Sequence, residues 1–75
     1  MTSVIPVTTL KRGKKGSEVK ALQILLIGWG FSCGSYGADS SFGPATEAAV
    51  RRFQKDRGLT IDGIVGVKTW SALLG

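Results

Sequence analysis

The sequence predicts an all-α domain, a small three-helix bundle joined by ordered glycine-rich loops. Apolar residues recur at helical spacing in three segments, and a turn-then-helix cassette occurs twice. No segment has a strand pattern of convincing length, although short bridges in residues 61–65 are compatible with the sequence. A chain of 75 residues is long enough for one small domain with a modest core.

The repeated cassette is the most informative feature of the chain. Residues 39–46 read DSSFGPAT and residues 62–69 read DGIVGVKT, a displacement of 23 positions from residue 39 to residue 62. Aspartate, glycine and threonine are identical in the two copies, and an apolar residue precedes each glycine. A second echo relates Val19-x-x-Leu22-Gln23 to Val50-x-x-Phe53-Gln54. We therefore expect a loop-then-helix unit that packs against its own copy.

The first helix is expected from Ser17 to about Gly28. Ser17 is a suitable N-cap, and Glu18 suits the positive end of the helix dipole. The residues at helical spacing on one side are Val19, Leu22, Leu26 and Trp29. Three further apolar residues widen this stripe: Ile24, Leu25 and Ile27. The wide stripe predicts a helix that is sandwiched between other elements.

The second helix is expected to begin at Pro44, since proline is favoured at the first helical position. It should end near Arg57, where Gly58 is a natural C-cap. A last short helix is expected from Val67 to Leu74, with Trp70 inward. The other residues expected in or over the core are Phe31, Phe42, Ala49, Val50, Phe53, Ile61, Ile64 and Val65.

Composition limits the classes of site. The chain has no histidine and a single cysteine, Cys33, which excludes a Cys/His zinc site and gives no base to activate the thiol. The longest apolar stretch, around Ile24–Ile27, is too short to span a bilayer, so we expect no membrane partner. The net charge of +5 favours polyanionic partners, or only confers solubility. Residues 1–9 are expected to be a linker or flexible arm, and residues 10–75 the domain.

An ordered set of anchors runs through nearly the whole chain. They are Leu10-x-x-Gly13-x-x-Gly16-x-x-Val19-x-x-Leu22-Gln23, Gly30-Phe31, Asp39-x-x-Phe42-Gly43-Pro44-x-Thr46-x-x-Ala49-Val50-x-x-Phe53-Gln54 and Gly58-Leu59-x-x-Asp62-Gly63-Ile64-Val65-Gly66-x-x-Thr69-Trp70-x-x-Leu73. This pattern resembles the peptidoglycan-binding domain of bacterial and phage cell-wall hydrolases. Two departures concern loop shape: Ser40 stands where the family usually has glycine, and the loop from Phe31 to Asp39 is longer than in many members.

The resemblance implies a monomeric binding module that attaches a linked catalytic domain, such as an endolysin, amidase or autolysin, to the bacterial wall. Its location would be extracellular or at the wall; a phage-encoded protein would be made in the host cytoplasm and released there. The module itself would have no catalytic residues, cofactor or metal. Asp39 and Asp62 could imitate a glycosidase pair, but their place in the repeat explains both as turn residues.

We predict a shallow groove floored by Trp29, the loop of residues 32–41 and the start of the second helix. The candidate ligand-binding residues are Trp29, Gly34, Ser35, Tyr36, Asp39, Ser40, Ser41, Arg51 and Arg52. Aromatic rings can stack on sugars or cover a peptide stem, whereas hydroxyl, N–H and guanidinium groups can bind stem carboxylates. The alternative roles are structural: capping of the bundle end for the aromatic residues, turn formation for Asp39, and a solvated helix face for the arginines.

Two glutamines have a separate expected role. We expect Gln23 and Gln54 to hydrogen-bond loop backbone that the glycine-rich turns leave unpaired. Thr46 and Thr69 should fasten the first turns of their helices.

Two other classes of function remain open at this point. A small basic three-helix domain could carry a helix-turn-helix that binds nucleic acid, but the last helix offers only Lys68 and small hydroxyls to a DNA groove. A domain that only packs against a catalytic partner would have no ligand of its own.

Overall fold

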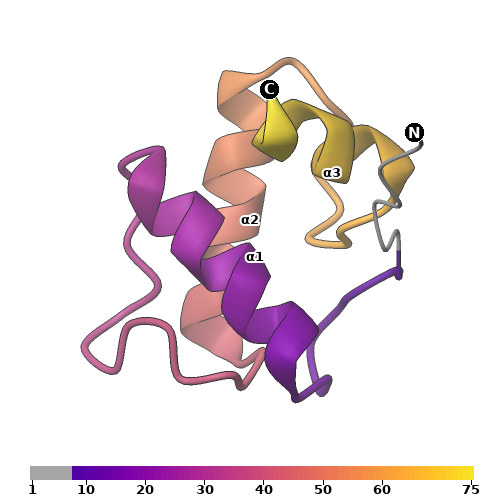
Figure 1. Ribbon diagram of the computed structural model, residues 1–75. Helices are drawn as coiled ribbons and strands as arrows, with labels where there is room; N and C mark the ends of the chain where they lie inside the picture. The colour runs from indigo at the N-terminus through magenta and orange to yellow at the C-terminus, as the bar shows by residue number, and fades with distance from the viewer. Residues whose placement is uncertain (1–7) are drawn as a thin grey trace, which may run out of the picture.

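The computed structural model describes residues 8–75 and contains three helices, α1 (Ser17–Gly28), α2 (Pro44–Asp56) and α3 (Val67–Leu74) (Figure 1). Between residues 8 and 75 there is no β-strand, only two isolated antiparallel bridges. The predicted all-α class and the predicted helices are therefore confirmed. Most of the expected N-terminal arm, residues 1–7, lies outside the described residues.

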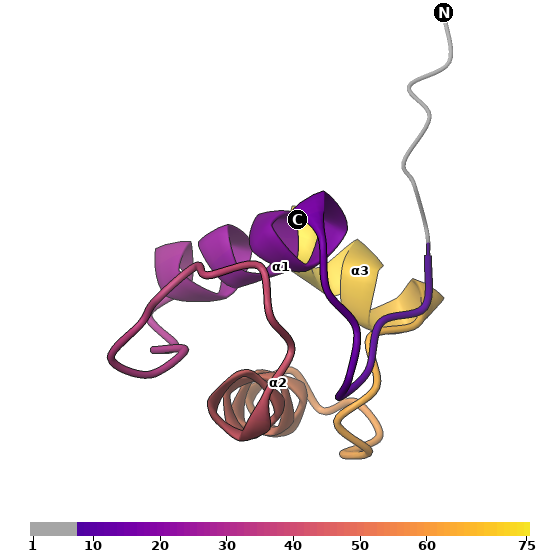
Figure 2. The ribbon, with the colours of Figure 1, turned by 90° about the horizontal axis from the view of Figure 1, so that it is seen from below.

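The helices form two layers. In Figure 2, α2 is viewed along its axis, while α1 and α3 lie together on one side of it. The core between the layers consists of Leu10, Val19, Leu22, Leu26, Cys33, Phe42, Ala49, Val50, Phe53, Val65, Trp70 and Leu73. The inward placement of Phe42, Phe53 and Trp70 is as predicted. Phe31 packs against the edge of this core, with its ring perpendicular to that of Phe53 at 5.6 Å between centroids.

The N-terminal segment ties the two cassettes into one unit. Leu10 pairs with Val65 through two backbone hydrogen bonds of 3.1 and 2.8 Å. Further along, Phe42 exchanges backbone bonds of 2.9 Å with Gly13 and Lys14. The indole of Trp70 also donates to the carbonyl oxygen of Thr8 at 2.9 Å. Thus contacts with the domain begin by Thr8, inside the stretch expected to be an arm.

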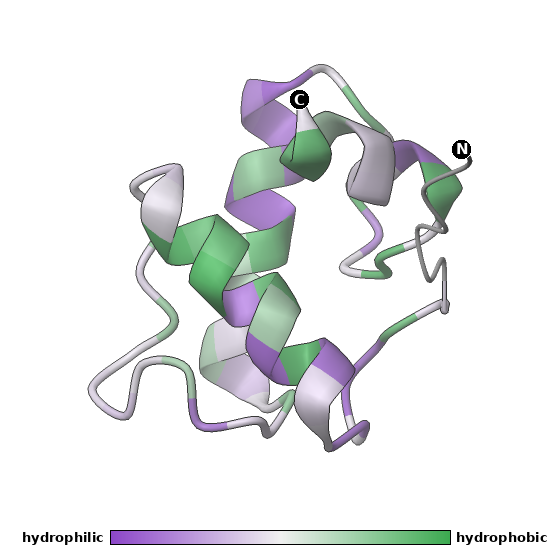
Figure 3. Ribbon diagram, in the orientation of Figure 1, coloured by the Kyte–Doolittle hydropathy of each residue, from purple (hydrophilic) through white to green (hydrophobic). Residues whose placement is uncertain are grey.

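The sequence-based description of α1 is wrong in two respects. Its N-cap is Gly16, and no side chain caps the helix, so Ser17 is the first helical residue. The helix is also not sandwiched, because Ile24 and Ile27 are 55% and 43% exposed. A bundle of three short helices has no further layer to cover the outer face of α1, so these two residues stay exposed. Figure 3 shows that much of α1 is made of hydrophobic residues.

The loop after Gly58 also differs from expectation. Ile61 and Ile64 are exposed, and of the three apolar residues expected to cover the core there, Val65 alone is buried. Val65 lies in the core, where its backbone pairs with that of Leu10, another core residue.

Candidate binding site

Two buried glutamines hold the loops that shape the candidate site. The amide nitrogen of Gln23, on α1, lies 3.0 Å from Asp39 Oδ1, from the Ser41 carbonyl oxygen and from Thr46 Oγ1. Its oxygen accepts a 2.9 Å bond from the N–H of Ser40. One side chain therefore joins α1, the turn after residue 38 and the start of α2.

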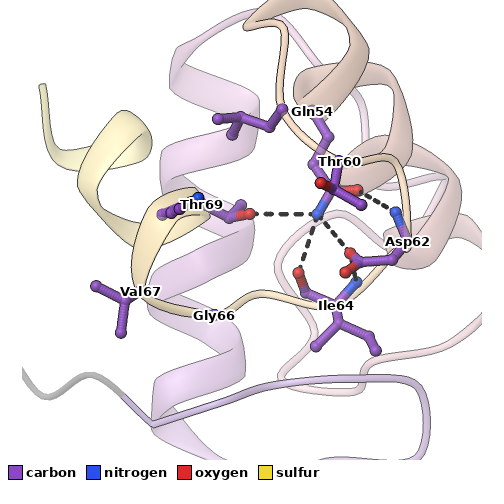
Figure 4. A pocket seen from close by; sticks show the side chains of 9 residues that line it. Gln54, Thr60, Asp62, Ile64, Gly66, Val67 and Thr69 are labelled. Atoms are coloured by element: carbon purple, nitrogen blue, oxygen red, sulfur yellow. Dashed lines mark hydrogen bonds between the residues drawn. The ribbon is translucent and has the colours of Figure 1, made fainter.

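Gln54, on α2, makes the equivalent set with the second cassette (Figure 4). Its amide nitrogen lies 2.9 Å from Asp62 Oδ1 and from the Ile64 carbonyl oxygen, and 3.2 Å from Thr69 Oγ1. Its oxygen accepts from the N–H groups of Asp62 and Gly63, at 3.2 and 3.0 Å. The expectation that both glutamines bond loop backbone is confirmed. Thr46 and Thr69, in the first turns of α2 and α3, each accept a hydrogen bond from the amide of the glutamine on the preceding helix.

The two copies differ in the length of chain that they enclose. Gln23 and Asp39 are 16 residues apart, whereas Gln54 and Asp62 are 8 apart. The first copy therefore holds eight additional residues between the same two anchor points. Gly34–Tyr36 lie in this longer loop, and we call it the extended loop (residues 29–38).

The carboxylates of the cassettes are hydrogen-bonded in the same way in both copies. The N–H of Ser41 and then the amide of Gln23 hold the pKa of Asp39 below its ordinary value of 3.8. The N–H of Ile64 and the amide of Gln54, with a smaller contribution from Arg51, lower the pKa of Asp62 in the same way. Both groups are therefore anionic acceptors at neutral pH.

We expect the domain to lose stability in acid through these two groups. Because the pKa of each carboxylate is lower in the folded state, its contribution is present above the unfolded-state value near 3.8 and is lost as pH falls through the folded value. Thermal unfolding measured from pH 7 to pH 2 should show a melting temperature that falls below about pH 4. The control is the double variant Asp39→Asn and Asp62→Asn, in which each asparagine keeps one oxygen that can accept the bonds now made to Oδ1 but cannot titrate. An equally steep acid loss in this double variant would assign the effect to other groups.

A groove of about 420 Å³, which we call the first groove, opens between the extended loop and the start of α2. Its lining residues are Cys33, Gly34, Ser35, Tyr36, Asp39, Ser41, Gly43, Pro44, Ala45 and Thr46. Five of the candidate ligand-binding residues are thus brought together: Gly34, Ser35, Tyr36, Asp39 and Ser41. Tyr36 is 85% exposed, so its ring is free to contact a ligand.

The structure does not bring the other candidates to this groove. Trp29 lies at the opposite end of α1, where its indole donates to the Leu73 carbonyl oxygen at 2.8 Å and the Arg57 guanidinium lies 4.3 Å from its ring centroid. Trp29 therefore contacts the end of α3, which fits the alternative role given above for the aromatic residues, capping of the bundle end. Ser40 turns its N–H to Gln23, and Arg51 and Arg52, both exposed on α2, do not line the first groove.

Sequence reasoning placed the start of the second helix at the first groove but named no ligand-binding residue among Gly43–Thr46. It also missed a second groove of about 280 Å³ at the start of α3 (Figure 4). The lining residues of this second groove are Gln54, Leu59, Thr60, Asp62, Ile64, Gly66, Val67, Lys68 and Thr69. The 23-residue repeat relates the residues that line the two grooves and could have indicated the second one, but it was used only to predict the fold.

Cys33, which lines the first groove, is a free and buried cysteine. Burial raises the pKa of the Cys33 thiol, and the negative charge of Asp39 raises it further against a hydrogen bond with Thr46, so the thiol stays protonated. Residues 8–75 contain no cluster of three or more side chains that could hold a metal ion. In the same part of the chain, no helix combines the length and hydropathy needed to cross a membrane.

The fold and the grooves together define a small helical binding module. Residues 15–73 match the family model described as "Putative peptidoglycan binding domain". The chain belongs to this family: it is a peptidoglycan-binding module of the kind found in cell-wall hydrolases, and it corresponds to the small binding domain and not to a catalytic domain. The nucleic-acid alternative is not retained, since α3 presents Lys68 as its single basic residue.

Curated relatives include the N-acetylmuramoyl-L-alanine amidase CwlL of Bacillus licheniformis, 52% identical over 88% of this chain. The zinc D-Ala-D-Ala carboxypeptidase of Streptomyces albus G is 43% identical over 87% of this chain. The chain spans only 18% and 26% of the length of these two proteins.

Solved structures agree with this relation. The N-terminal domain of SleB superposes with a TM-score of 0.86 at 37% identity, covering 95% of this chain and 94% of that domain. The endolysin of Burkholderia phage AP3 superposes with a TM-score of 0.80 at 44% identity, covering 88% of this chain and 24% of the endolysin.

Proposed function

We propose that the first groove binds a stem peptide of peptidoglycan, and that the domain thereby holds a linked wall hydrolase on its substrate. The observation that carries this proposal is the groove itself. Its two walls offer different chemistry, with the exposed ring of Tyr36 on the extended loop and the uncapped N-terminus of α2 opposite. A short peptide with apolar side chains and a free carboxylate matches both walls.

The start of α2 supplies donors for a carboxylate. No side chain caps this helix, and the first N–H to bond within it is that of Glu47, to the Gly43 carbonyl oxygen at 3.0 Å. The N–H groups of Ala45 and Thr46 therefore precede the internal hydrogen bonds, at the positive end of the helix dipole. The Asp39 carboxylate on the same groove suits an ammonium or amide N–H of the ligand.

A basic loop lies beside the first groove and favours the same target. Lys15 forms a bridge with Ser41, which lines the groove, so the cluster of Lys11, Arg12, Lys14 and Lys15 is held close by. Bacterial walls carry many carboxylates, and such a cluster raises the local concentration of the domain at an anionic surface. The effect should weaken with added salt.

Weak binding is sufficient for this role. A linker converts the encounter of the catalytic domain with the wall into an intramolecular event, so even millimolar affinity raises the local enzyme concentration. In this proposal the protein acts outside the cell or at the cell wall. The domain acts as a monomer in this proposal, because the first groove is complete within one chain.

Retention on purified sacculi free of teichoic acid tests the proposal. Ala45→Glu places a carboxylate in the first groove, where it should repel stem carboxylates and lower retention by about tenfold. The fold should survive, since an acidic side chain in the first turn stabilises a helix by about 0.3–1 kcal/mol. Ala21→Glu is the matched control, an exposed alanine on α1 that lines neither groove. Absence of retention of the folded wild-type domain at moderate salt would refute wall binding and favour a domain that only packs against its catalytic partner.

A further inference from the structure

The second groove has the same relation to α3 as the first groove has to α2. Six lining positions correspond under the 23-residue displacement: Asp39 with Asp62, Ser41 with Ile64, Gly43 with Gly66, Pro44 with Val67, Ala45 with Lys68 and Thr46 with Thr69. In each groove the aspartate and threonine bind the glutamine of the preceding helix. The second groove is therefore a structural copy of the first, built by the same cassette.

Two differences make the second groove the better acceptor of an anion. Val67 has a backbone N–H where Pro44 has none, and Lys68 contributes an ammonium group where Ala45 has a methyl group. The first N–H to bond within α3 is that of Trp70, to the Gly66 carbonyl oxygen at 2.9 Å. Three backbone donors thus precede it, and no side chain caps the helix.

The remaining wall of the second groove determines what fits. Leu59 and Thr60 form this wall, where the first groove has the extended loop, and the volume is about 280 Å³ instead of about 420 Å³. The Asp62 carboxylate lies here too, where it accepts hydrogen bonds from the N–H of Ile64 and the amide of Gln54; these bonds, with a smaller contribution from Arg51, lower its pKa. A short peptide end with one free carboxylate suits this smaller space.

We propose that the second groove binds the terminal carboxylate of a second stem peptide, so that one domain can hold two stems of the wall. This inference rests on the proposed function, because it assigns the same ligand class to the repeated groove. Binding at two grooves of one rigid domain gives an avidity gain of about 10²–10⁴ over one groove when both stems are within reach.

Amide chemical shifts distinguish the two grooves directly. The ¹⁵N-labelled domain is titrated to about 10 mM with a synthetic stem tetrapeptide, made with either lysine or diaminopimelate at its third position, and with the C-terminal amide of each. We expect the amides of residues 66–69 to move along with those of Gly43, Ala45 and Thr46, since Pro44 has no N–H. The C-terminal amide should bind residues 66–69 at least about tenfold more weakly. Movement at residues 43–46 alone would overturn the second site and leave the proposed function standing; no movement at either would refute both grooves.

A pair of charge variants provides the matched test. Lys68→Glu should abolish the shifts at residues 66–69 and preserve those at residues 43–46, whereas Ala45→Glu should do the reverse. Lys20→Glu makes the same charge change near the start of α1, lines neither groove and should leave both sets of shifts intact. On intact sacculi, Lys68→Glu should lower retention by at least about tenfold. Retention equal to that of Lys20→Glu would show that the second groove does not contribute to wall binding.

Discussion

Replacement of Gln54 by leucine should destabilise the domain by about 3–5 kcal/mol, although the two side chains are similar in size. The change removes five hydrogen bonds that join α2 to the second cassette. Among their partners, the Gly63 N–H and the Thr69 hydroxyl belong to buried residues, and each unpaired buried group costs about 1–3 kcal/mol. A chain of this size has a total stability of about 4–11 kcal/mol, so the loss is a large part of it.

Urea and thermal unfolding measure this effect, and two variants isolate its cause. Lys55→Leu changes the exposed neighbour of Gln54 and should alter stability by less than about 0.5 kcal/mol. Gln54→Glu keeps acceptor oxygens for the loop N–H groups but places a second carboxyl beside Asp62. Burial and this charge should raise the pKa of the new glutamate in the folded state, so its destabilisation should grow as pH rises through about 4.3. A Gln54→Leu variant as stable as Lys55→Leu would contradict the structural role of the cluster.

Exchange of serine and glycine between the two cassettes should change stability in opposite directions. Ser40 has φ 69° and the equivalent Gly63 has φ 71°, so both turns use the left-handed conformation. A side chain in that conformation costs about 1–2 kcal/mol, whereas glycine costs about 0.4–1 kcal/mol in unfolded-state entropy. Ser40→Gly should therefore stabilise the domain by about 0.5–1 kcal/mol.

Gly63→Ser should destabilise the domain by about 1–2 kcal/mol. Besides the backbone strain, a Cβ atom on Gly63 would lie 3.0 Å from Arg51 Nε and 3.1 Å from Glu47 Cγ, so both side chains must shift. Urea unfolding of the two single variants at neutral pH compares them directly. Ser41→Gly, at a position without a positive φ, serves as the control and should only destabilise. Loss of stability in Ser40→Gly equal to that in Ser41→Gly would show that the turn is not strained.

The helices could be predicted from the sequence because their ends carry strong local signals. Pro44 begins α2 and Gly58 follows its end, as expected. The exposure of Ile24 and Ile27 could not be predicted in the same way, because periodicity identifies an apolar stripe but not how many elements are available to cover it. Burial of a stripe depends on tertiary neighbours, and α1 has neighbours on one side only.

The candidate site was predictable where it depends on the chain nearby, and not where it depends on distant contacts. Tyr36, Asp39 and Ser41 are close in sequence, and they share the first groove. The position of Trp29 depends on the Leu73 carbonyl oxygen, 44 residues away, which no local pattern indicates. The second groove could be predicted only by assuming that the repeated cassette forms a similar site as well as a similar fold.

The first copy of the cassette has eight additional residues between Gln23 and Asp39, so part of its loop can vary without changing the contacts that hold the helices. Because the contact between Gln23 and Asp39 is the same one that closes the shorter copy, the exposed tip of the extended loop at Ser35 and Tyr36 can change while the helices stay in place. Engineered wall-targeting modules could therefore be selected from libraries randomised at Ser35, Tyr36 and Ala38. Gly34 is kept constant, because a Cβ atom there would lie 2.8 Å from Ala45 Cβ, together with Gly37 and the glutamines, aspartates and threonines of the two cassettes.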